Sequence, residues 1–109
     1  MANTFKLKTK ANVGVTTVGI YTAPAATTTV VIGITMSNTS GSGVNVGVGI
    51  TRAGTTEDVK LLKNAPIPQG SSLEFMAGNK VVLEATDTVT VHSDTNNSVD
   101  AALTIMEIT

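Results

Sequence analysis

The chain has 109 residues, which is enough for one domain with a single modest core. Hydrophobic residues make up 41% of the chain and aromatic residues only 3%, so a core must be built from aliphatic side chains and methionine. The formal net charge of −1 lacks the basic excess of a nucleic-acid-binding protein, and the absence of cysteine excludes disulfides and thiolate metal sites.

The first predicted strand, residues 4–10, carries three alternating lysines. Lys6, Lys8 and Lys10 share one face of an extended segment, because side chains alternate along a strand. Lysine is typical of an edge strand, where it discourages pairing with other chains, and a phosphate or partner contact is the alternative. The segment lacks the apolar stretch of a signal peptide, and no later run has the length of a membrane helix. We therefore expect synthesis in the cytoplasm and no membrane partner.

The clearest strand is TVVIGITMSN at residues 29–38, which alternates with period two. After a TSGSG turn, a second alternating run, VNVGVGIT, follows at 44–51, so we expect the two runs to pair as a β-hairpin. The outward positions of the second run include Gly47 and Gly49. Such a smooth face indicates either tolerance in a surface strand or close approach of another backbone.

Turn signals rich in Gly, Pro and Asn separate further predicted strands at residues 13–21, 57–63, 71–76, 80–85, 87–93 and 98–108. No segment shows a sustained helical period. This pattern predicts one all-β domain over residues 1–109, a single antiparallel β-sandwich of immunoglobulin-like or jelly-roll-like type. The predicted core consists of Val30, Ile32, Ile34, Val46, Val48, Leu73, Phe75, Val89, Val91, Leu103 and Ile105.

The last strand, in SVDAALTIMEIT, is apolar on both faces, with Met106 and Ile108 opposite the predicted core face. A strand of this kind is usually buried on both sides. The N-terminal strand folding over it would provide the second cover, and another subunit is the alternative.

The stretch NAPIPQGSSLEF at residues 64–75 combines two prolines with a glycine turn. Pro66 and Pro68 fix φ and remove two backbone donors, which predicts a rigid, extended connector between sheets outside any hydrogen-bonded ladder. Gly70 then permits a tight turn. Between the prolines, Ile67 is expected either to serve this architecture or to form an exposed apolar knob that meets a neighbouring molecule.

Few residues have the types and spacing that chemistry requires. His92 is the only histidine and falls on the expected solvent face of its strand. Asp94 and Asp100 bracket the oxygen-rich TNNSV, which lacks the alternating acids of a calcium loop and is more typical of a plain turn. The nucleophile elbow, the phosphate-binding loop and the dinucleotide fingerprint are all missing. We therefore predict no enzymatic activity, no catalytic residue, no cofactor and no metal.

Several short motifs occur in a fixed order along residues 12–108: YTAP at 21–24, SN at 37–38, LKNAPIP at 62–68, GSSL at 70–73, KVVLEATD at 80–87 and a final EI. In this order they resemble a family of small virion structural proteins of tailed bacteriophages. The resemblance implies a structural protein of the virion, made in the host cytoplasm. Each motif alone is weak, and their shared order carries the resemblance.

A small, nearly neutral sandwich of this kind suits a capsid decoration or cement protein that lies on the capsid surface and stabilises capsomers of the major capsid protein. We expect a homo-oligomer, with a trimer favoured. A tail, neck or baseplate component is the alternative, and a host-surface or carbohydrate-binding module would need exposed aromatic residues. Residues 1–11 are expected to form an N-terminal assembly arm. The candidate interface residues are Lys6, Lys8, Lys10, Ile67, Met106 and Ile108.

Overall fold

The structure is a computed structural model that describes residues 3–54, 57–75 and 80–109. Strands predominate, and the described residues contain no helix, hence none long and apolar enough to cross a membrane. The strands are β1 (Asn3–Val13), β2 (Val18–Thr22), β3 (Thr28–Asn38), β4 (Val44–Arg52), β5 (Glu57–Ile67), β6 (Ser72–Phe75), β7 (Val81–Leu83), β8 (Thr88–Ser93) and β9 (Val99–Ile108). Each corresponds to a strand that the alternation of the sequence predicts.

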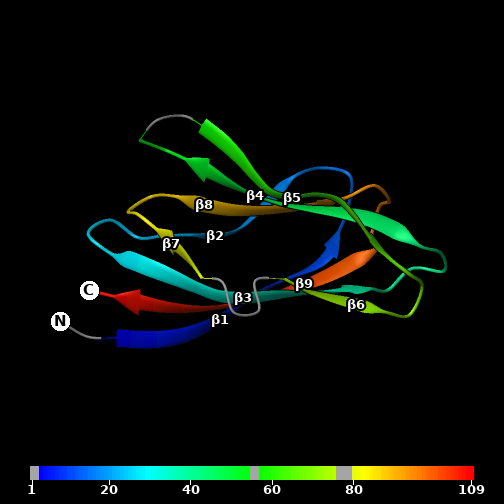
Figure 1. Ribbon diagram of the computed structural model, residues 1–109, viewed down its shortest axis with the longest axis horizontal. Coiled ribbons are helices and arrows are strands. Elements are labelled where there is room, and N and C mark those ends of the chain that lie inside the picture. The colour runs from blue at the N-terminus through cyan, green and yellow to red at the C-terminus, as the bar shows by residue number, and fades with distance from the viewer. Residues whose placement is uncertain (1–2, 55–56, 76–79) are drawn as a thin grey trace.

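Two antiparallel sheets form the layers of a sandwich (Figure 1). Sheet A has the order β1-β9-β3-β6, with β7 also pairing to β3, and sheet B has the order β2-β8-β4-β5. The first strand pairs with the last, the second with the next to last, and so on inward, with β6 and β7 sharing one position. This nesting is the jelly-roll arrangement. The β-sandwich prediction is therefore confirmed, and the topology selects the jelly roll over the immunoglobulin-like alternative.

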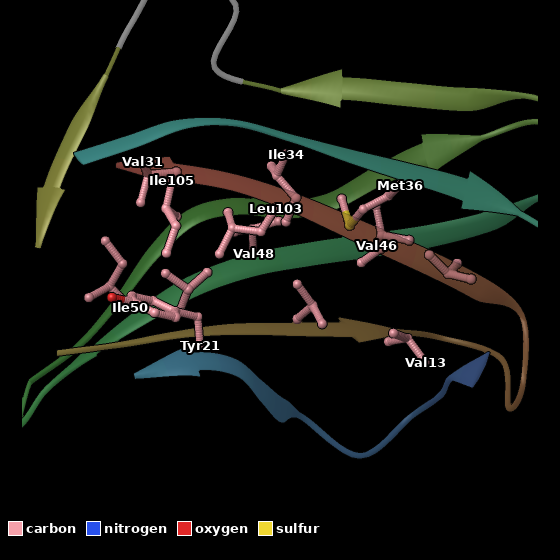
Figure 2. Close-up of a cluster of buried hydrophobic side chains, with 14 of the residues drawn as sticks. Val13, Tyr21, Val31, Ile34, Met36, Val46, Val48, Ile50, Leu103 and Ile105 are labelled. Atoms are coloured by element: carbon pink, nitrogen blue, oxygen red, sulfur yellow. The ribbon is translucent and has the colours of Figure 1, made fainter. Parts of the chain in front are cut away.

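The core lies between the two sheets and is almost entirely aliphatic. Side chains from both sheets point into the space between them (Figure 2). Tyr21, with 7% of its surface exposed, is the one aromatic residue in this core cluster. The fully buried large side chains include Met36, Leu83, Leu103 and Ile105. Burial of such aliphatic surface is the main favourable term in folding a chain of this composition.

The predicted hairpin between residues 29–38 and 44–51 is wrong. β3 belongs to sheet A and β4 to sheet B, so the two strands face each other across the core and do not pair. Their connection is an arch in which the Asn38 side-chain amide donates to the carbonyls of Ser42 (2.8 Å) and Ile67 (3.0 Å). Alternation predicts only that each strand has one buried face. Two strands that pair in one sheet and two strands in opposite sheets both have such a face, so alternation does not distinguish them.

The predicted burial of Val30 and Ile32 is also wrong. The register between β3 and β9 shifts between Val31 and Gly33, where β3 uses one residue more than β9. This β-bulge reverses the face on which later residues lie. As a result Val31 and Ile34, each 2% exposed, both reach the core, while Val30 and Ile32 are only half-buried. Leu73 and Phe75, also predicted in the core, are partly buried and pack against it.

The segment around Pro66 is a ladder strand, which corrects the prediction of an unpaired connector. Ala65, Pro66 and Ile67 pair with Val46, Asn45 and Val44 of β4, respectively. β5 is the edge of sheet B, and an edge position tolerates a residue without a backbone donor. The expectation of an exposed knob is wrong as well, because the Ile67 side chain is 1% exposed and belongs to the core.

The chain does change sheets directly after this strand. The Ser71 N–H donates to the Pro68 carbonyl at 3.1 Å, and Gly70 has a φ of 74°, a left-handed value that favours glycine. The turn leads from β5 in sheet B to β6 in sheet A. The predicted glycine turn and the routing between sheets are thus both present.

The two outward glycines of β4 lie under neighbouring groups of their own sheet. A Cβ atom at Gly47 would overlap the imidazole ring of His92 on β8. A Cβ at Gly49 would lie 2.9 Å from the Val59 carbonyl oxygen of β5. Glycine is therefore needed here for close packing within sheet B, and the half-buried His92 occupies the space that Gly47 leaves.

Candidate assembly surface

The two carboxylates that bracket the predicted TNNSV turn accept hydrogen bonds from the backbone. The Asn45 N–H donates to Asp94 Oδ1 at 3.1 Å, and the Asn12 N–H donates to Asp100 Oδ1 at 3.0 Å. The two carboxylates thus stabilise different connections and do not converge on a common point. Within residues 3–54, 57–75 and 80–109, no group of three or more His, Asp or Glu side chains could hold a metal ion.

A polar cluster lies at the end of the sandwich where β1, β2, β3 and β9 meet. The Tyr21 hydroxyl donates to Glu107 Oε2 at 2.6 Å, and Lys6 Nζ lies 2.8 Å from Glu107 Oε1. Because the single hydroxyl proton of Tyr21 is used on Glu107, the Thr29 hydroxyl at 2.8 Å must donate to the Tyr21 oxygen. The cluster joins the edge strand β1 of sheet A to β2 of sheet B.

The electrostatics of this cluster follow from its burial and its partners. The Glu107 side chain is only 8% exposed, whereas that of Lys6 is 43% exposed. The hydrogen bond from Lys6 and then that from Tyr21 hold the pKa of Glu107 below its ordinary value of 4.5. Burial and the neighbouring Glu107 raise the pKa of Tyr21 to about 12. Glu107 is thus an ionised, nearly buried carboxylate whose cation comes from the N-terminal strand.

The three lysines lie on the core-facing side of sheet A, on its edge strand, where Lys6 and Lys10 are exposed and Lys8 is half-buried. Lys6, Lys8 and Lys10 pair with Ile105, Leu103 and Ala101, which are core residues, and directly paired residues share a face. β1 is the edge of its sheet, as the lysines predict. It lies beside β9, so it does not cover the second face of that strand (Figure 1).

The opposite, outer face of sheet A carries an exposed apolar surface. Phe5 pairs with Met106, Met106 with Val30, and Val30 with Val82, so a row of apolar side chains crosses the sheet. Phe5 is 68% exposed, Leu7 64% and Val82 58%. We define the outer apolar patch as Phe5, Leu7, Val30, Val82, Met106 and Ile108.

The outer apolar patch is free of charge along its rows. Its three registered rows are completed by Asn3, Thr28, Thr104 and Gly33, none of which is charged. An exposed apolar face of this kind is typical of a surface that contacts another protein. The sequence pattern identified Met106 and Ile108 but missed Phe5 and Leu7. The alternation of TFKLKTK already placed these two residues opposite the lysines.

No protein-family model and no curated protein matches this sequence. The resemblance to the tailed-phage family therefore stays a prediction.

Several solved structures share the fold at low sequence identity. A Bacillus endospore appendage subunit, from appendages that form disulfide-linked pili, is 15% identical with a TM-score of 0.60; the alignment covers 99% of this chain and 87% of that one. The Drosophila NLP-core, described as a histone-binding pentamer, is 11% identical with a TM-score of 0.58, covering 97% and 99% of the two chains. A chain of the infectious bursal disease virus particle is 13% identical with a TM-score of 0.58; 96% of this chain matches 30% of the viral one. At these identities the likeness shows a common fold alone.

Proposed function

We propose that the chain is a structural subunit of a tailed-phage virion, a capsid decoration protein that binds the assembled shell of the major capsid protein through the outer apolar patch. The observation that carries this proposal is the patch itself, an uncharged apolar face whose Phe5, Leu7 and Val82 are more than half exposed. Burying one such side chain contributes about 1.5–3 kcal/mol, so a few of them suffice for a specific contact.

Two further observations support a structural role. The fold is shared with a chain of the infectious bursal disease virus particle and with a subunit of the Bacillus appendages that form pili. This chain has no cysteine, so it would assemble without the disulfides that link the appendage pili. Of the three aromatic residues, Tyr21 is buried and Phe75 is half-buried, which leaves Phe5 as the one exposed ring. A single exposed ring does not favour the carbohydrate-binding alternative, which uses several for stacking.

Substitution within the patch tests the proposal. The double variant Phe5→Ser/Val82→Ser is expected to bind heads that lack the protein at least about tenfold more weakly, because a loss of 1.4 kcal/mol already gives that factor. Its free energy of unfolding should stay within about 0.5 kcal/mol of the wild type, since both side chains are exposed. Co-sedimentation with purified heads measures the binding.

A matched control is Val59→Ser on β5, which removes an exposed apolar side chain from the other sheet. It should bind heads as the wild type does. Wild-type binding by the double variant would contradict the proposal, as would equal weakening by the control. A loss of self-association with unchanged head binding would assign the patch to contacts between copies.

A further inference from the structure

Residues 3–10 of β1 are attached to the rest of the chain mainly through backbone pairing. They pair residue for residue with 101–108 of β9. Seven of the eight residues are exposed, and Lys8 is half-buried. Because burial of apolar surface is the dominant favourable term in folding, this segment contributes little to the core. Every residue of the segment is nevertheless paired with β9, so its backbone holds the β9 edge along the whole length of a normal strand.

A break in register separates this segment from the anchored end of β1. Lys10 pairs with Ala101 and Val13 with Val99, so β1 uses one residue more than β9 over this interval. Within it Asn12 has a φ of 59°, in the left-handed region. Val13 is 2% exposed and its carbonyl accepts the Ser98 N–H at 3.1 Å. Rotation at residues 11 and 12 would therefore swing residues 3–10 while Val13 stays in the core. It would break the hydrogen bond from the exposed Asn12 N–H to Asp100 Oδ1, and both groups could then bind water.

Among the described residues, the Lys6–Glu107 ion pair is the side-chain contact that attaches this segment to β9. Without Lys6, Glu107 would be a nearly buried carboxylate with a neutral hydrogen-bond donor, Tyr21, and no ion-pair partner. In the part of the chain that the structure describes, the only cation that would still act on it is the more distant Lys8, which lies on the same segment. Leaving a buried charge unpaired is costly. The β9 edge therefore favours a paired strand that places a cation beside Glu107. The strand that fits is residues 3–10, whether from the same copy or from another.

From these features we infer that residues 3–10 form an exchangeable strand, which leaves its own β9 and pairs with the β9 edge of a second copy of this chain. Exchange replaces each contact with an identical one, so its free energy depends on the hinge at 11–12 and on the local concentration of copies. This inference rests on the proposed function, because copies that lie close together on a shell would provide the high local concentration of β9 edges. The exchanged strand would link the copies into a homo-oligomer.

Thiol crosslinking between two singly substituted populations tests the exchange, because the chain has no cysteine of its own. Full-length Phe5→Cys and Met106→Cys chains are unfolded together, refolded at high concentration and treated with a short crosslinker that carries two maleimide groups, each of which adds one cysteine thiol. Residues 5 and 106 face each other in the ladder, so exchange places them opposite each other in different copies. We expect covalent dimers joined at 5 and 106 by mass spectrometry, about tenfold above a mismatched pair.

The mismatched pair is Phe5→Cys with Ala102→Cys, because residue 102 faces Thr9 in the native register. Thr9→Cys with Ala102→Cys is the second matched pair and guards against a folding defect in the first. Failure of both matched pairs to exceed the mismatched pair would overturn the exchange and leave β1 as a fixed edge strand. Head binding by the wild-type chain is measured separately. Dimers without head binding would refute only the proposed function, and head binding without dimers would refute only the exchange.

Discussion

Replacing Ile67 with alanine is expected to lower the free energy of unfolding by about 3–4 kcal/mol, because removing a buried branched side chain loses its transfer free energy and leaves a cavity. The side chain is 1% exposed and lies in the core where β5 pairs with Val44. Chemical denaturation with urea measures the change, provided that the slope against denaturant is the same in both proteins.

Two controls separate burial from the local chemistry of this segment. Ile67→Val, which removes one methylene, should cost only about 1 kcal/mol. Val59→Ala on the same strand, at a side chain that is 40% exposed, should cost less than the alanine change at Ile67. Equal losses of unfolding free energy at Val59 and Ile67 would mean that the Ile67 side chain is exposed, as in the exposed apolar knob considered in the sequence analysis.

Replacing Lys6 with methionine is expected to destabilise the protein by about 2 kcal/mol at neutral pH, because Glu107 then stays nearly buried without its cation. The loss is smaller than for a fully buried pair, since Lys6 itself is 43% exposed and partly solvated. The hydrogen bond from Lys6, followed by that from Tyr21, lowers the pKa of Glu107 from 4.5 in the folded protein. The stability that this ionisation contributes is therefore present above pH 4.5 and is lost as the pH falls through the folded pKa.

The difference between Lys6→Met and the wild type should consequently keep its full size above pH 4.5 and shrink as the pH falls below 4.5, because a protonated Glu107 needs no cation. Denaturation curves at a series of pH values measure it. Lys10→Met makes the same change on the same strand and face, at a residue outside the cluster, and should show a small difference that is independent of pH. A loss in Lys6→Met that stays constant down to acid pH would mean that the ion pair with Glu107 does not stabilise the fold.

Local sequence patterns predicted the strands but not their partners. Period-two alternation depends on one face being buried, so it located each strand, including β3 and β4. It carries no information on whether two such strands pair or face each other, and so the hairpin prediction failed. The bulge between Val31 and Gly33 inverted the burial of Val30 and Ile32, because one additional residue reverses the face of a strand.

Edge positions account for the other differences. Pro66 argues against a strand only if both backbone edges are paired, and the sequence does not reveal that β5 is an edge. Five of the six predicted interface residues lie on sheet A, with the three lysines on one face and Met106 and Ile108 on the other, whereas Ile67 lies in the core on β5 of sheet B. The cluster around Glu107 was missed, although the alternation of β9 already placed this carboxylate on the buried face with Ile105. A charge at such a position indicates that a buried partner is required.

The number of copies of this chain in purified virions tests the proposed function most directly. Quantitative mass spectrometry against the major capsid protein gives the ratio. A decoration protein that covers the shell predicts a copy number comparable to that of the major capsid protein. A handful of copies per particle would contradict this account and place the chain at the neck, tail or baseplate, and complete absence from the virion would refute a virion role.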